Sequence, residues 1–153
     1  MATANQVAQY IVNFFQQVGD PITNLKLQKL LYYVQGWHLG LRGTPAFNDR
    51  LEAWVHGPVQ PEVYRTYSAN RWNPIVAEVE VPSLPDDLVQ LIGDVLETYG
   101  ADSGYELELR SHREAPWLEA RGALAPDENS NAVLANATME RFFSALAADG
   151  QAQ

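Results

Sequence analysis

Apolar residues recur along most of this chain at intervals of three and four positions, the spacing that places them on one face of a helix. Five segments show this pattern, and we expect an amphipathic helix in each of them: 7–18, 27–41, 88–99, 105–112 and 139–146. Two shorter helices are expected to begin at Pro61 and Pro116, because the missing amide donor of proline costs nothing in the first turn of a helix. The chain is therefore predicted to be mainly α-helical.

Capping residues indicate where several of these helices begin. Thr23 precedes the leucine-rich helix, and Ser103 with Glu106 has the spacing of a capping box, in which each side chain bonds the backbone amide of the other residue. Ser83 and Asp86 form a similar pair at the start of the preceding helix. These signals predict distinct helices joined by short connections.

One segment follows a different period. Residues 75–81 alternate apolar with acidic side chains, which is typical of a half-buried extended segment, and residues 50–55 are a candidate partner strand. We therefore predict a single compact helical domain spanning residues 1–153, with about six to seven helices and a small β-hairpin or short extended pair. The last residues, 147–153, are expected to form a frayed tail.

Composition and charge narrow the classes of function. A chain of 153 residues has the size of one ordinary domain, and its lack of cysteine removes disulfide and thiol chemistry. No apolar run approaches the ~20 residues of a membrane span, so we expect a cytoplasmic protein without membrane contact. The net charge of -9 argues against direct nucleic-acid binding, since that binding depends on Lys and Arg neutralising phosphates.

Two sequence blocks are more specific than composition. The first comprises the runs KLQKLLYY (26–33), QGWH (35–38), EAW (52–54), GPV (57–59) and VY (63–64). The second is LRSHREAPW (109–117), which contains a His-x-Glu-x-Pro-Trp pattern. In both blocks the chain resembles the Panacea domain family, which includes SocA-like antitoxins and phage-associated GepA-like proteins. The resemblance extends from about Gln6 to Phe143.

This resemblance implies a function and a partner. It implies an antitoxin of a type II-like toxin-antitoxin pair, which neutralises a cognate toxin by direct protein-protein binding, with the toxin encoded by the adjacent gene. SocA-like members also look like proteolytic adaptors. The alternative is therefore that the chain delivers a bound toxin to an AAA+ protease.

Aromatic and basic residues of the first block form the predicted partner-binding surface. Trp and Tyr offer a large contact area with a polar tip, and a Gly-Pro step makes a rigid turn beside them. Since Tyr32 and Tyr33 are adjacent on a helix, one of them is expected to point away from the face that the other occupies. The predicted surface comprises Lys26, Lys29, Tyr32, Tyr33, Trp54, His56, Gly57, Pro58 and Tyr64.

A second set of residues has a structural and a functional interpretation. In the structural one, the carboxylate of Glu114 holds the imidazole of His112 while the indole of Trp117 fills the core. In the functional one, His56, His112 and Glu114 meet near Trp54 and line a cleft. The whole structural and polar cluster comprises Trp37, His38, His112, Glu114, Pro116 and Trp117.

Catalysis ranks below both binding functions. A small hydrolase would use His112 with Glu114, or His56, as a general base. The sequence has no nucleophile elbow, Walker loop or dinucleotide glycine pattern, and no helical histidine pair with zinc-binding spacing. We therefore predict a binding protein with no catalytic residue, cofactor or metal site.

Overall fold

A computed structural model describes residues 1–152 of the chain. Within these residues the fold is mainly α-helical with one small antiparallel sheet, which confirms the predicted fold class. The buried apolar side chains other than Val59 form one cluster. The elements in chain order are α1 Ala4–Gln17, α2 Asn24–Arg42, β1 Glu52–Trp54, β2 Gly57–Val59, α3 Pro61–Thr66, the 3₁₀ turn η1 Ser68–Asn70, α4 Asp86–Tyr99, α5 Gly104–Ser111, α6 Ala115–Arg121 and α7 Asn136–Ala152.

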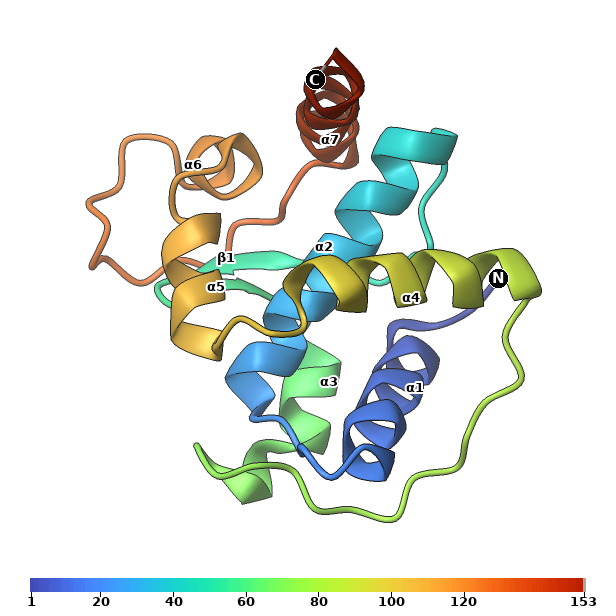
Figure 1. Ribbon diagram of the computed structural model, residues 1–153. Helices are drawn as coiled ribbons and strands as arrows, with labels where there is room; N and C mark the ends of the chain where they lie inside the picture. The colour runs from blue at the N-terminus through green and yellow to red at the C-terminus, as the bar shows by residue number, and fades with distance from the viewer. Residues whose placement is uncertain (153) are drawn as a thin grey trace.

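Helix α2 runs through the centre of the molecule, and the other elements are arranged around it (Figure 1). It contacts α1, α3, α4, α5, α7 and β2. The helix predicted here is confirmed, but most of its length is buried on every side, so its predicted amphipathic character is wrong. Several of its polar residues are interior groups, and they include Asn24, Gln28, Lys29 and Gln35.

The interior polar groups of α2 bond backbone groups of later segments. The side-chain oxygen of Gln35 accepts from the amides of Ala46 and Phe47, at 2.8 and 3.3 Å, and its nitrogen donates to the Phe47 carbonyl at 2.7 Å. The side-chain oxygen of Gln28 accepts from the amide of Gln60 at 2.9 Å. Buried polar groups need such partners, so these side chains fix the chain that follows α2.

Helix α7 packs against α2 at two glycines. A Cβ at Gly36 would lie 2.1 Å from Cε2 of Phe143, and one at Gly40 would lie 2.6 Å from Cβ of the same residue. The Phe143 side chain is fully buried. The two helices approach each other so closely because α2 has no side chains at these positions.

The predicted caps are confirmed at two helices and wrong at a third. Thr23 and Ser103 each accept a hydrogen bond from the amide three residues later, and Ser103 takes part in a full capping box. At α4 the residue before the helix is Pro85, which has no side-chain group to bond. Asp86 instead lies in the first turn, where the helix dipole favours a negative charge. Ser83 therefore does not cap this helix.

Residues 75–81 form no strand and do not pair with residues 50–55, although the predicted β-hairpin exists. The half-burial predicted for this segment is confirmed, since Ile75, Ala77 and Val79 are more buried than the residues between them. Strand β1 pairs with β2, which directly follows it, in the register Glu52 with Val59 and Trp54 with Gly57. The backbone of segment 75–81 bonds α1 and the chain after it: the amide of Ile75 donates to the carbonyl of Ile22 at 2.7 Å, and the side-chain amide group of Gln16 both donates to and accepts from Ala77, at 2.9 Å each. A two-residue connection between β1 and β2 costs less chain entropy than pairing two distant segments.

The chain's last residues were predicted to be frayed. Helix α7 continues to Ala152, and Gln153 lies outside the described residues, so the expected motion of 147–153 stays a prediction. Of the helices that the structure describes, none combines the length and apolarity required to span a membrane.

Candidate functional site

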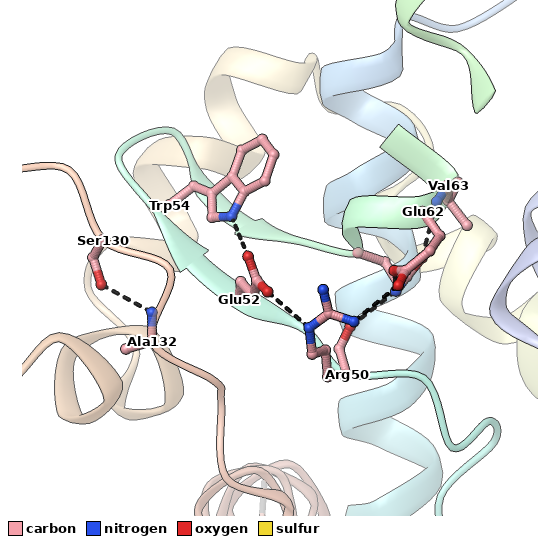
Figure 2. A network of polar contacts seen from close by, with 8 residues as sticks. Arg50, Glu52, Trp54, Glu62, Val63, Ser130 and Ala132 are labelled. Carbon is pink, nitrogen blue, oxygen red and sulfur yellow. Dashed lines mark hydrogen bonds and ion pairs between the residues drawn. The ribbon is translucent and has the colours of Figure 1, made fainter. Parts of the chain in front are cut away.

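The β-hairpin is fixed along the outer edge of β1 by the segment that leads into α7. The amide of Ala53 donates to the carbonyl of Ala132 at 2.8 Å, and the amide of Leu134 donates to the carbonyl of Leu51 at 2.9 Å. This segment therefore lies beside β1 as a short third chain, and Figure 2 shows it next to the hairpin. The backbone groups on this edge are bonded within the molecule.

The outer edge of β2 is bonded by side chains of α2. The ammonium group of Lys29 donates to the carbonyl of Pro58 at 2.9 Å. Lys29 is 0% exposed, and burial lowers the pKa of its ammonium group to about 7, although the nearby charge of Glu108 opposes that shift. Gln28 bonds the chain just after β2, as described above. Lys29 is thus an interior residue. The prediction that it contributes to an exposed partner-binding surface is wrong.

A polar network holds the outward face of the hairpin and joins it to α3 (Figure 2). The guanidinium group of Arg50 bonds Glu52 at 2.8 Å and Glu62 at 2.9 Å, and the indole of Trp54 donates to Glu52 at 2.9 Å. Hydrogen bonds from Gln60 and Arg50 lower the pKa of Glu62 to about 2. The carboxylate of Glu52 therefore fixes the indole orientation of Trp54.

A groove with a volume of about 590 Å³ opens beside this network, between the hairpin, α2, α3 and the chain after η1. Trp54 and Tyr64 form part of its wall, with ring centroids 5.1 Å apart in an edge-to-face arrangement. Aromatic pairs with this geometry are favourable beyond the area they bury. The groove is lined by Thr23, Asn24, Leu25, Gln28, Lys29, Trp54, His56, Val59, Tyr64, Ser68, Arg71, Trp72 and Glu108.

His56 lies at the tip of the hairpin, between this groove and a more polar one. Its side chain is 75% exposed, and its Nδ1 lies 3.2 Å from a carboxylate oxygen of Glu108. The second groove has a volume of about 770 Å³ and shares Trp54 and His56 with the first. Its other lining residues are Glu52, Val55, Arg65, Asp127, Asn129, Ser130 and Asn131.

Tyr32 and Tyr33 are both fully buried, so the prediction that one of them is exposed is wrong. Their hydroxyl groups donate to the same oxygen of Glu114, at 3.0 and 3.1 Å. The Tyr33 ring also stacks on Tyr99 at a centroid distance of 4.0 Å. Burial raises the pKa of Glu114 to about 7, against the effect of the two hydrogen bonds. Because α2 is surrounded, both adjacent side chains meet the core.

His112 and Glu114 do not form the predicted imidazole-carboxylate pair. The His112 ring stacks on Trp117 at 4.2 Å, and its buried Nε2 has no hydrogen-bond partner among the described residues. Burial lowers the pKa of His112. The indole of Trp117 is buried and donates to the carbonyl of Trp54 at 2.8 Å. The cluster of His56, His112 and Glu114 is therefore not assembled, because Glu114 is bonded by tyrosines.

The remaining predicted residues bond neighbouring elements. Lys26 donates to a carbonyl just after α4 at 2.6 Å, away from the hairpin. The indole of Trp37 donates to the Tyr99 hydroxyl at 2.9 Å, and the His38 ring bonds a carbonyl in the loop after α2. Pro116 is buried in the first turn of α6. Gly57 and Pro58 are buried in β2 and line neither groove, so they are not part of an exposed surface.

Sequence reasoning missed two exposed residues at the mouth of the first groove, Arg71 and Trp72. They lie in a turn, outside every amphipathic pattern. The sequence did contain one signal for this position: Trp72 is a large apolar residue in a polar turn, where burial in a helix face does not explain it. Across residues 1–152 there is no group of three or more His, Asp or Glu side chains placed to hold a metal ion.

Comparison with known proteins agrees with the motif blocks. The family model described as "Antitoxin SocA-like, Panacea domain" matches residues 27–118. The chain belongs to this Panacea family. Antitoxin SocA from Caulobacter vibrioides is 35% identical to it over 127 residues, which cover 74% of this chain and 68% of that protein. No solved structure matches the chain.

The part that matches the Panacea model runs from α2 to α6. It contains the hairpin and the aromatic residues of the first groove, Trp54, Tyr64 and Trp72. It also contains the buried Glu114 with both tyrosines. The Panacea match thus covers the groove-lining residues from Gln28 to Glu108, while Thr23, Asn24 and Leu25 precede it.

Proposed function

We propose that this Panacea chain is an antitoxin that neutralises a cognate toxin by direct protein-protein binding, and that the toxin is encoded by the adjacent gene. One observation carries the proposal: the 35% identity with Antitoxin SocA across most of both chains. The segment that matches the family model contains most residues of the groove described above, including Trp54, Tyr64 and Trp72, which supports a surface suited to a protein partner.

The exposed aromatic side chains support a binding function at this groove. Tyr64 is 38% exposed and Trp72 is 78% exposed, and both line the groove with Trp54. Tyr and Trp are enriched among residues that contribute most to protein-protein affinity. The proposed partner-binding surface therefore includes the predicted Trp54, His56 and Tyr64, while Lys29 supports the hairpin from the interior.

Co-expression with the product of the adjacent gene tests this function. The expected result is that the neighbouring protein alone arrests growth, that co-expression restores growth, and that the two proteins purify together. A His56→Ala, Tyr64→Ala variant is expected to weaken both rescue and co-purification. Tyr105→Ala, which removes an exposed aromatic ring that does not line the groove, serves as the matched control and is expected to rescue fully.

Toxin lifetime distinguishes neutralisation from delivery to a protease. A direct inhibitor leaves the bound toxin intact, so its lifetime is expected not to shorten on co-expression. Rescue that requires an AAA+ protease and coincides with loss of the toxin would support the adaptor alternative. A neighbour that is harmless and does not bind would contradict the proposed function.

A further inference from the structure

Trp72 is the most exposed aromatic side chain on the groove. The residue is 78% exposed, and it lies in the chain that leaves η1 and lines the same groove as the aromatic pair of Trp54 and Tyr64. A large aromatic ring left in water at the mouth of a groove offers apolar area that a partner can cover. Leu25 and Val59 add apolar side chains to the lining of the groove.

The groove walls are held rigidly. Trp54 is fixed through its hydrogen bond to Glu52, which also belongs to the hairpin, and through its contact with Tyr64 of α3. Val59 is buried in β2, whose outer edge is bonded by the ammonium group of Lys29. A preformed groove requires little ordering when a partner enters, which favours affinity.

The exposed rim of the groove carries a cation, Arg71, on a chain whose net charge is -9. Lys29 also lines the groove, but its ammonium group is buried and bonded to the Pro58 carbonyl, and Glu108 is the carboxylate among the lining residues. That carboxylate already pairs with His56. Arg71 is exposed and forms no ion pair with any described residue. Its free guanidinium group suits a carboxylate of a partner.

We infer that this groove binds a short segment of the partner protein in which a large apolar side chain lies beside an acidic residue. The apolar side chain enters between Trp54, Tyr64 and Trp72, and the acidic side chain pairs with Arg71 at the rim. The inference rests on the proposed function for the identity of the partner, since the toxin would supply the segment. The recognition chemistry itself follows from the groove alone.

The first experiment measures binding of the co-purified partner to groove variants. Trp72→Ala is expected to weaken binding by about 30-fold or more, the scale of a central aromatic contact. Arg71→Glu is expected to slow association, and this difference from wild type is expected to shrink at about 0.5 M salt, where exposed charges are screened. Tyr105→Ala and Arg141→Glu are matched controls outside the groove, and both are expected to bind as wild type.

The second experiment does not depend on the toxin. Three hexapeptides, DEFLDE, KKFLKK and DESSDE, are titrated into the free protein while the indole N–H signals of Trp54 and Trp72 are followed by NMR. Only the acidic and apolar peptide DEFLDE is expected to shift both signals, and Arg71→Glu is expected to reduce that shift. Because peptides replace the toxin here, a failed growth rescue and a failed groove assignment give different results.

Several outcomes would overturn the inference. Wild-type affinity in both Trp72→Ala and Arg71→Glu would show that the partner binds elsewhere. A stronger response to KKFLKK, or no response to any peptide, would show that the groove does not select an acidic and apolar segment. A wild-type dimer in size-exclusion chromatography that Trp72→Ala dissociates would show that a second copy of the chain occupies the groove.

Discussion

Replacing Gly36 with alanine tests the close packing of α7 against α2. The added Cβ would lie 2.1, 2.5 and 2.6 Å from three atoms of the Phe143 ring, where ordinary contacts are 3.4–4 Å. The ring cannot swing aside, because other rings surround it. Its centroid lies 5.7 Å from that of Tyr32, 6.1 Å from Tyr33 and 5.3 Å from Trp37.

Two opposing effects set the size of the change in the free energy of unfolding. Alanine is favoured over glycine in a helix interior by about 1 kcal/mol. Overpacking a core costs about 1–3 kcal/mol, and losing the packing of a buried phenylalanine costs about 3–5 kcal/mol. Since three rigid ring atoms overlap with the new group, we place the steric cost at about 3–4 kcal/mol. The net loss is then about 2–3 kcal/mol.

Thermal and urea unfolding, followed by circular dichroism and tryptophan fluorescence, measure this loss. For a chain of this length, a loss of about 2–3 kcal/mol lowers the melting temperature by roughly 4–12 °C. Gly93→Ala on α4 is the matched control, because no atom lies within 4 Å of a Cβ there. It is expected to gain up to about 1 kcal/mol from helix propensity.

A double variant isolates the contact itself. If Phe143 is the obstacle, Gly36→Ala is expected to cost clearly less in a Phe143→Leu background than in the wild type, because the smaller side chain vacates the overlap. The reasoning is refuted if Gly36→Ala is as stable as Gly93→Ala, or if its cost is the same in both backgrounds. Either result would mean that α7 does not pack against α2 at this glycine.

Two buried charges predict opposite pH dependences. Burial raises the pKa of Glu114 from 4.5 to about 7, so the folded protein retains a proton that the unfolded chain releases, and stability is expected to fall by up to about 3 kcal/mol across that interval. Glu114→Gln keeps an acceptor for the hydroxyl groups of Tyr32 and Tyr33 and is expected to abolish this fall in stability. Urea unfolding at several pH values measures it. Burial lowers the pKa of Lys29 from 10.5 to about 7, so the unfolded chain binds more protons and stability is expected to rise by up to about 4 kcal/mol from pH 7 to 10.5. Lys29→Met is expected to flatten this rise. If either variant kept the wild-type dependence of stability on pH, the pKa shift assigned to the replaced residue would be wrong.

Most helices were predictable because each one carries its own signal. The spacing of apolar residues and the caps at Thr23 and Ser103 are local properties, and they appear in the structure as expected. The burial of α2 was not predictable in this way. Its interior polar residues have the sequence pattern of a solvated face, while the groups they bond belong to later segments such as the hairpin and the loop at Phe47. Only the folded chain brings them together.

The candidate site was predicted in part for the same reason. Trp54, His56 and Tyr64 are close in sequence, so a compact motif block sufficed to group them. Trp72 joins them only because the chain after η1 returns to the mouth of the groove. Glu114 was expected to hold His112 as the partner that a buried imidazole needs, but the tyrosine hydroxyl groups of α2, distant in sequence, bond the Glu114 carboxylate instead. Interactions between distant segments decided each of these differences.

The bonded edges of the hairpin restrict how a partner can be recognised. Many proteins bind an extended peptide by strand addition, in which the free backbone groups of an edge strand pair with it. Here the segment before α7 occupies the edge of β1, and the side chain of Lys29 occupies a carbonyl on the edge of β2. Recognition at this hairpin therefore depends on side chains. Substitutions on the groove surface can change which partner is bound while the backbone beneath it keeps its pairing.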